Sequence, residues 1–422
     1  MTLTNARILT FDSANRVLDS GSVEIRADGS IGSVSKGRVR GRDVVDAGGR
    51  VLMPALINCH THLYSTLARG LVLPGPPPAD FPAILKKLWW RLDRALSEED
   101  VYYSALAGLI DSAKCGIGTV IDHHSSPNAC AGSLDRIARA FQKVGLRGAT
   151  CYETSDRNGR ANALAAIQEN VRFLERRRAG GLVGGAFGLH AAFTLSDRTL
   201  RACAEANQSF RAAFHVHVAE GRIDQTAVRR LFDSGILNQR TLAAHCVHIT
   251  GTDRSLLARC GVNVVHNPQS NCNNAVGAAD VPALLRRKVL VGLGSDGYAP
   301  RLWEELKAAL HLEKLQARDP RVASPDLLLN NRIIVMKIWG IDLGRIETGA
   351  QADLILVDYF PPTPIDSDNL FGHLLFGVAN APVDSLIVNG RYVLRDKQCV
   401  NVDERKIAEK AAARAKALWE RL

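Results

Sequence analysis

The chain has 422 residues, a formal net charge of +10 and a hydrophobic fraction of 46%. Its length predicts a large domain with a smaller unit beside it. Its basic residues are dispersed, which argues against nucleic-acid binding, and no apolar stretch reaches the roughly 18 residues of a membrane span. Because no basic segment followed by an apolar run opens the chain, we expect a cytoplasmic protein that binds neither nucleic acid nor membrane.

Both ends of the chain predict short β-strands. Apolar and β-branched runs broken by turn residues occupy 4–10, 22–25, 31–34, 353–358, 385–390 and 392–394. The pair Asn389-Gly390 between two of these runs is a hairpin turn signal. We therefore expect residues 1–54 and 346–422 to form one accessory β-sandwich, with a charged helix at the end of the chain.

The long middle of the chain, residues 55–345, predicts a (β/α)8 barrel of the TIM type. Candidate strands occupy 56–62, 119–124, 147–154, 184–190, 212–217, 242–248, 262–266 and 290–296. Helical patterns, for example over 134–143 and 199–206, separate most of them. Strands that alternate with helices predict a parallel sheet, and eight such units predict a closed α/β barrel. A proline-rich segment over 73–81 leads into a helix expected around 84–94, and we expect this loop to cover the mouth of the barrel.

Metal-ligand residues end several of these candidate strands. His60 and His62 alternate on the first strand, so both side chains face the same side. His217 and Asp296, at the ends of two later strands, complete a set of three imidazoles and one carboxylate. Such a set favours zinc, with iron as the alternative. Because no lysine lies between 143 and 288, a modified lysine from a middle strand cannot bridge two metals, and we expect one divalent metal per chain.

Two further side chains are placed to move protons. Glu220 lies three residues after His217, within reach of a water on the metal, and His245 ends the sixth candidate strand, where it would orient that water together with Asp296. A bound divalent metal lowers the pKa of its water from ~15.7 to roughly 7. The resulting zinc-bound hydroxide would attack an amidine-like or amide carbon, and Glu220 would pass the proton to a ring nitrogen or to the leaving group.

Further histidines are candidates for contact with substrate. His190 ends the fourth strand. His123 and His124 are successive strand residues and face opposite sides, so at most one of them points into the barrel mouth; a structural role in hydrogen bonding remains the alternative for both.

The chain resembles the amidohydrolase superfamily, in the branch of the cytosine, guanine and S-adenosylhomocysteine deaminases and the chlorohydrolases. The motifs that carry the resemblance are Met53-Pro54, His60-Thr61-His62, His217-Val218-Ala219-Glu220, Ala244-His245-Cys246-Val247-His248, His266-Asn267-Pro268, Ser295-Asp296-Gly297 and the closing segment 349–354. Within the branch, residues 88–96 and 121–124 resemble the SsnA-type aminohydrolases.

The resemblance implies metal ligation by His60, His62, His217 and Asp296, with Glu220 and His245 catalytic. It also implies substrate contacts by His190 and Asp93, to which we add His248 of the motif around His245. Two positions depart from the usual pattern: Ala55 stands where a glycine is usual, and Asn58 where an aspartate is usual. Neither removes a ligand, although both could alter the geometry of the strand end.

Together these patterns predict a metal-dependent hydrolase of carbon–nitrogen bonds other than peptide bonds, which deaminates a small nitrogen heterocycle such as a purine, pterin or pyrimidine. Hydrolytic ring opening of a cyclic amide, or dechlorination, would use the same residues. An alternative hypothesis, from a class other than enzymes, is a catalytically inactive barrel that serves as a binding or scaffold protein. The expected partner is a small molecule, and homodimers or larger homo-oligomers are common for such barrels.

Overall fold

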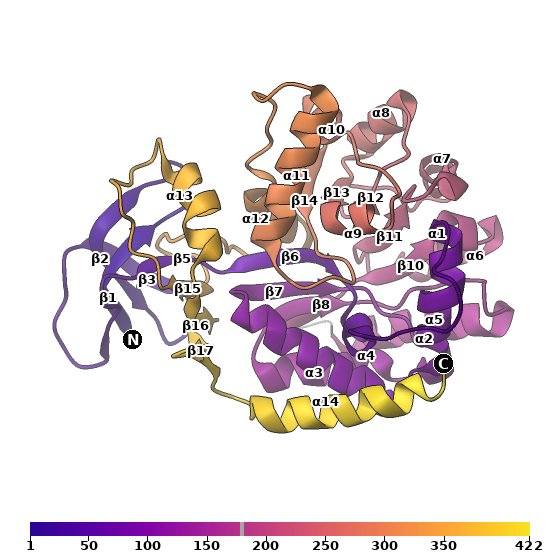
Figure 1. Cartoon of the computed structure of the whole chain (residues 1–422), viewed down its shortest axis with the longest axis horizontal. Coiled ribbons are helices and arrows are strands. Elements are labelled where there is room, and N and C mark those ends of the chain that lie inside the picture. The colour runs from indigo at the N-terminus through magenta and orange to yellow at the C-terminus, as the bar shows by residue number, and fades with distance from the viewer. Residues whose placement is uncertain (178–180) are drawn as a thin grey trace.

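The computed structural model describes residues 1–177 and 181–422. A barrel and a strand-rich unit lie side by side, and the last helix of the chain runs along the barrel (Figure 1). No helix among the described residues is both long and apolar enough to cross a membrane.

The strand-rich unit combines both ends of the chain. Its strands are β1 (Thr2–Leu9), β2 (Val17–Ile25), β3 (Ile31–Lys36), β4 (Val44–Asp46), β5 (Val51–Pro54), β15 (Leu354–Val357), β16 (Val383–Val388), β17 (Arg391–Arg395) and β18 (Gln398–Cys399). They follow the order β18-β17-β16-β15-β5-β1-β2-β3, and β4 pairs with β1. The antiparallel pairing of β5 with β15 joins the two chain ends, which confirms the predicted accessory β-sandwich.

The central strands of this unit are buried on both faces. Successive strand residues point to opposite sides, so Leu354 and Leu356 enter the unit's own core while Ile355 and Val357 join the barrel core. A buried ion pair strengthens the junction, because Arg147 Nε lies 2.8 Å from Asp353 Oδ2. The barrel therefore packs against strands that are buried on both of their faces.

The barrel strands form two parallel arcs. The first contains β6 (Leu56–Thr61), β7 (Ile117–Asp122), β8 (Arg147–Thr150) and β9 (Val183–Gly185), and the second contains β10 (Phe187–Ala191), β11 (Phe214–Val218), β12 (Leu242–His245), β13 (Asn263–His266) and β14 (Leu290–Leu293). All eight predicted strands are present, and the fourth is divided into β9 and β10. β9 pairs with β8 whereas β10 pairs with β11, so the break lies where one arc gives way to the other.

Short bridges close the two arcs into a barrel. Thr61 pairs with Asp296 on one side, and Thr154 pairs with Leu189 on the other. The buried Asn331 amide spans the first seam, because its Nδ2 donates to Ile57 O at 2.6 Å and to Leu293 O at 2.9 Å. One side chain thus holds the first and last strands together.

Helices surround the barrel. They are α3 (Glu98–Lys114), α4 (Ser133–Val144), α5 (Arg160–Arg176), α6 (Asp197–Ala206), α7 (Ala227–Asp233), α8 (Gly251–Cys260), α9 (Pro268–Asn273), α10 (Val281–Arg286), α11 (Leu302–Ala317) and α12 (Leu327–Trp339), while α13 (Leu370–Phe376) belongs to the C-terminal segment. The helices predicted over 134–143 and 199–206 lie within α4 and α6. The terminal helix α14 (Glu404–Trp419) packs on α3, where Arg414 Nε donates to Asp100 Oδ1 at 2.8 Å.

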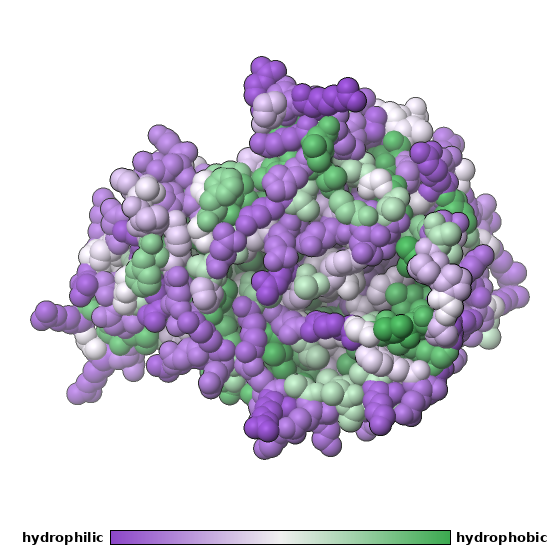
Figure 2. All heavy atoms as spheres, viewed as in Figure 1, coloured by the Kyte–Doolittle hydropathy of each residue, from purple (hydrophilic) through white to green (hydrophobic). Residues whose placement is uncertain are grey.

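A helical segment reaches over the mouth of the barrel. It consists of α1 (Phe81–Ile84), one π-helical turn (Leu85–Trp89) and α2 (Trp90–Ala95). The preceding proline-rich loop is largely exposed, whereas Phe81 and Leu85 pack with Val276 in a small apolar cluster. The helix, more than the loop, therefore covers the mouth. Figure 2 shows mostly hydrophilic side chains on this side of the molecule, with hydrophobic ones gathered beside the segment that carries α1.

Candidate metal centre and active site

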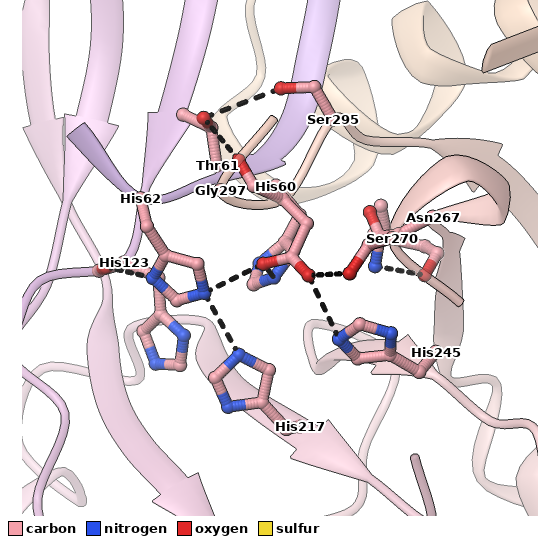
Figure 3. A network of polar contacts seen from close by, with 12 residues as sticks. His60, Thr61, His62, His123, His217, His245, Asn267, Ser270, Ser295 and Gly297 are labelled. Carbon is pink, nitrogen blue, oxygen red and sulfur yellow. Dashed lines mark hydrogen bonds and ion pairs between the residues drawn. The ribbon is translucent and has the colours of Figure 1, made fainter. Parts of the chain in front are cut away.

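The four predicted metal ligands meet at the carboxyl ends of the barrel strands. His60 lies on β6 and His62 just beyond it, His217 lies on β11, and Asp296 follows β14. His62 Nε2 is 3.1 Å from His217 Nε2 and 3.0 Å from Asp296 Oδ1, and His60 Nε2 is 3.5 Å from the same carboxylate oxygen. Figure 3 shows the rings of His62, His217 and His245 turned toward a common centre. The structure thus brings together side chains that are up to 236 residues apart.

The hydrogen bonds behind these rings make the site fit a metal. His62 Nδ1 lies 2.6 Å from His123 O, and His217 Nδ1 lies 2.7 Å from His190 O. Because a carbonyl only accepts, each ring donates through Nδ1, and each Nε2 of a neutral ring presents a lone pair. Two lone pairs 3.1 Å apart repel each other unless a cation lies with them. Three imidazoles and one carboxylate are a donor set that zinc prefers.

The pKa values of His62 and His60 also indicate that the cluster suits a cation. Burial lowers the pKa of His62, but its hydrogen bond with Asp296 and the charges of Glu153 and Asp296 raise that pKa to about 9. Without a metal, the protein therefore holds a proton at this position. Burial lowers the pKa of His60 to about 4, and its Nε2 has no hydrogen-bond partner among the described residues. The cluster therefore favours a positive charge among its ligand atoms, as a bound metal ion would supply.

Glu220 and His245 lie beside the ligand cluster, as predicted. His245 Nδ1 donates to Asn271 Oδ1 at 2.8 Å, which aims Nε2 at the centre. That Nε2 is 3.5 Å from Glu220 Oε2 and 3.9 Å from Asp296 Oδ2. Burial raises the pKa of Glu220 to about 7, so near neutral pH this carboxylate can both accept and release a proton.

The backbone at these strand ends adopts an uncommon conformation. Ala219, His245, Cys246 and Asp296 have φ values of 47°, 72°, 53° and 52°. This left-handed region costs energy for residues other than glycine, and it persists where the surrounding structure imposes it. The chain therefore holds strain at the turns that aim Glu220, His245 and Asp296.

A cavity lies over the cluster, with an empty volume of about 750 Å³ that includes its opening to solvent. Its apolar wall contains Phe81, Leu85, Trp89, Trp90 and Phe193. Its charged wall contains Asp93, Glu153, Arg157, Glu220, Asp224 and Asp296. A concave apolar site with a few convergent polar groups is typical of small-molecule binding.

The five predicted substrate contacts separate into two groups. His190 and Asp93 line the cavity, whereas His123, His124 and His248 are not among the described residues that do so. Strand alternation turns His123 into the barrel, where its ring stacks on His215 at a centroid distance of 4.3 Å. His124 faces the other way, and its Nε2 lies 2.8 Å from Ser126 Oγ. A substrate contact by these three residues gains no support from the cavity.

Three charged residues of the cavity wall, Glu153, Arg157 and Asp224, were not predicted from the sequence. Glu153 is buried, its Oε1 lies 3.2 Å from His62 Nδ1, and burial raises its pKa to about 7. Arg157 forms a buried ion pair with Asp93 and lies 5.5 Å from the centre of the Trp90 ring. Glu153 lies inside the third predicted strand segment, so its place at a strand end was a usable signal. Arg157 belongs to the loop after that strand, where no pattern marks it.

Comparison with known proteins places these motifs in a family. The model of the amidohydrolase family matches residues 51–393. A 5-methylthioadenosine/S-adenosylhomocysteine deaminase of Pelotomaculum thermopropionicum is 32% identical over 99% of this chain and 98% of its own length. A 5'-deoxyadenosine deaminase of Methanosarcina mazei is 31% identical over the same shares of the two chains.

Solved structures share the fold. An adenosine deaminase from Xanthomonas campestris with bound zinc has a TM-score of 0.87 at 22% identity, covering 100% of this chain and 98% of its own. An atrazine chlorohydrolase from Arthrobacter aurescens, complexed with zinc and atraton, has a TM-score of 0.83 at 21% identity, covering 99% of both chains. The chain therefore belongs to the amidohydrolase family and is a metal-dependent aminohydrolase, an enzyme of carbon–nitrogen bonds other than peptide bonds.

Proposed function

We propose that this enzyme uses one zinc ion per chain, held by His60, His62, His217 and Asp296, to deaminate an adenine-type nucleoside with an uncharged 5' group. The convergence of the ligand atoms beneath the cavity carries the proposal. His60, His62 and His217 belong to one group of ligand atoms within 4.8 Å of one another, and His60, His217 and Asp296 belong to a second such group, which also includes His245. The names of the relatives direct it to adenine nucleosides, since those proteins are deaminases of 5-methylthioadenosine, S-adenosylhomocysteine and 5'-deoxyadenosine.

The reaction replaces the exocyclic amine of an amidine carbon by oxygen, with water consumed and ammonia released. Zinc held by the four ligands would make a water molecule at this place more acidic. Glu220 would take one proton from the attacking water and deliver it to the ring nitrogen, and would then pass the second proton of that water to the amine, which leaves as ammonia. His245, whose Nε2 lies 3.5 Å from Glu220 Oε2 and 3.9 Å from Asp296 Oδ2, would orient the attacking oxygen together with Asp296.

The cavity wall suits a flat, uncharged ring. Trp89, Trp90 and Phe81 offer aromatic surfaces on one side. His190 Nδ1 lies 2.8 Å from Thr194 Oγ1, whose own hydrogen goes to Ala191 O, so the ring donates through Nδ1. Its Nε2 is then an acceptor at the cavity wall, available to a hydroxyl or amine of the substrate.

The charges of the wall argue against a substrate with a negative group. Five of its side chains are carboxylic acids, and Arg157, the one lysine or arginine among the described lining residues, is already paired with Asp93. An additional carboxylate away from the metal would meet no unpaired lysine or arginine among them. We therefore expect 5'-deoxyadenosine or 5-methylthioadenosine to be better substrates than S-adenosylhomocysteine, whose amino-acid tail carries a carboxylate.

Ammonia release by zinc-loaded protein tests the proposal, with the purine absorbance recorded in the same samples. The panel contains 5'-deoxyadenosine, 5-methylthioadenosine, S-adenosylhomocysteine, guanine, cytosine and an aminated pterin. Ammonia with a shifted but retained purine spectrum supports the proposal. Loss of the ring absorbance without ammonia would instead favour ring opening, chloride release from a chlorotriazine would favour dechlorination, and failure to bind zinc would favour the scaffold.

Several finer expectations remain predictions from the sequence. They are the SsnA-type resemblance of residues 88–96 and 121–124, zinc rather than iron, a homo-oligomeric state, a cytoplasmic location, and the division into 1–54, 55–345 and 346–422. Metal analysis, light scattering and limited proteolysis of the purified chain test the metal, the oligomer and the division.

A further inference from the structure

We propose that His215 is a positioning residue for the ligand His60, at the centre of a buried relay that runs from Asp122 O through Cys151 and His215 to His60. The relay rests on the metal site proposed above. It concerns how tightly that site binds its metal, and it does not depend on which substrate the enzyme uses.

The contacts of the relay are continuous. His215 lies two residues before His217 on β11, so both rings face the barrel interior, His215 one level deeper. Its Nε2 is 2.8 Å from His60 Nδ1, and its Nδ1 is 3.8 Å from Cys151 Sγ. Cys151 Sγ is in turn 3.7 Å from Asp122 O. The side chains of His60, Cys151 and His215 are fully buried.

The direction of each hydrogen bond in the relay follows from Asp122 O, which can only accept. Asp122 O is a carbonyl oxygen and only accepts, so the Cys151 thiol donates to it. Burial raises the pKa of that thiol well above its usual value, which keeps the proton in place. The Cys151 sulfur is then free to accept, and His215 donates to it through Nδ1.

The relay ends on the metal ligand. The ion pairs between histidines and carboxylates among the described residues involve His60, His62, His123, His190 and His245 but not His215, so a charged ring there would be buried without a partner, at a high cost. A neutral His215 with its proton on Nδ1 accepts at Nε2, and His60 must therefore donate from Nδ1. The lone pair of His60 is thereby placed on Nε2, the atom that faces Asp296 at 3.5 Å.

His60 differs in this respect from the other two histidine ligands. His62 and His217 donate to the backbone carbonyls of His123 and His190, which no substitution removes. His60 alone among the three depends on a side chain for its tautomer. The stacked ring of His123, inclined by 14° to that of His215, holds the plane of His215 in place. A substitution of His215, which is not a proposed ligand, can therefore disturb the orientation of the ligand His60.

Two substitutions at one position separate hydrogen bonding from packing. His215→Phe keeps a planar ring and removes the acceptor, whereas His215→Gln supplies an amide oxygen close to the place of Nε2. Partners of metal ligands typically contribute 10–100-fold to metal affinity. We therefore expect His215→Phe to weaken zinc binding by about 10–100-fold and His215→Gln to recover most of that loss.

The readouts are zinc affinity by chelator competition, the absorption spectrum of the cobalt-loaded protein, and thermal unfolding of the metal-free protein. The relay predicts weaker zinc binding and an altered cobalt spectrum for His215→Phe while metal-free unfolding stays close to that of the parent protein. Unchanged zinc affinity in His215→Phe overturns the relay. Equal losses in His215→Phe and His215→Gln overturn it as well, because packing would then explain both.

A second pair of variants covers the case in which His215→Phe fails to fold. Cys151→Ala removes the relay's second member, and Cys203→Ala removes an equally buried thiol on α6, outside the relay. Only Cys151→Ala should weaken zinc binding, and equal affinities in the two variants would contradict the relay. The parent protein separates this test from that of the function: bound zinc without ammonia release refutes the nucleoside substrate and leaves the relay intact.

Discussion

The mouth of the barrel and the sheet built from the two chain ends satisfy their buried groups in opposite ways. In the sheet, β5 and β15 are apolar on both faces, and their neighbours supply the packing. At the mouth, several buried polar atoms lack a hydrogen-bond partner among the described residues, including His60 Nε2, His245 Nε2, Asp93 Oδ1, Glu153 Oε1 and Trp90 Nε1. Buried polar groups are normally hydrogen-bonded, so these atoms indicate the place where the protein needs a metal and a substrate.

The backbone shows the same contrast. The hairpin between β16 and β17 turns at Asn389 and Gly390, whose φ values are 50° and 73° and whose residue types tolerate that conformation. The strand ends at the mouth place Ala219 and Cys246 in the same region, although these residue types avoid it. This hairpin of the sheet thus uses favourable residues for its turn, and the mouth accepts strain to aim its side chains.

The largest effect at the mouth should be the loss of zinc affinity on removal of one proposed metal ligand. His62→Ala deletes the imidazole that contacts both His217 and Asp296, so zinc affinity should fall by more than the about 10–100-fold that the loss of a ligand's partner costs. Metal analysis after dialysis measures it. The control His311→Ala changes an exposed histidine of α11 and should keep its zinc; full zinc retention in His62→Ala would refute its assignment as a ligand.

The next largest effect should fall on turnover alone. Glu220→Gln keeps the shape of the side chain and removes its ability to accept a proton, so kcat should fall by a factor on the order of 10² or more. Zinc content should match that of the parent protein, because Glu220 is not among the proposed ligands. An unaffected kcat would remove Glu220 from proton transfer.

A pH profile should sharpen the role of the same carboxylate. Burial raises the pKa of Glu220 to about 7, and only its ionised form accepts the proton. As the pH falls below that value, Glu220 becomes protonated, and kcat/KM should decline about tenfold per pH unit. The profile of zinc-saturated enzyme on both sides of neutrality measures this limb, and a flat acid side would contradict the assignment.

The smallest effect on catalysis should come from the sheet. Leu354 is fully buried in the core of that unit, and Leu354→Ala should lower the free energy of unfolding by about 2–5 kcal/mol because it leaves a cavity. Zinc affinity and kcat should stay unchanged in the folded protein. Denaturant unfolding and zinc titration together test the contrast, and a loss of zinc affinity would show that the two regions are coupled.

The sequence predicted the barrel and the sandwich, and it marked the four proposed metal ligands, because each depends on a local pattern. His60 and His62 show their shared face through the two-residue period of a strand, and Asp296 shows its role by ending an apolar run. The fourth strand was predicted as one segment, and its division into β9 and β10 depends on how two arcs of sheet meet. Arg157 lies in a loop without periodicity, so no pattern in the sequence indicated its ion pair with Asp93.

By itself, then, the sequence determined which elements form and which residue types end them, since hydrophobic periodicity and turn chemistry act over a few residues. Only the tertiary structure decided that Glu153 lies beside His62, that His124 turns away from the cavity, and that Cys151 and His215 stand behind His60. The contacts of Glu153, Cys151 and His215 join residues at different strands of the barrel. They depend on the register and closure of the whole barrel, which no short stretch of sequence encodes.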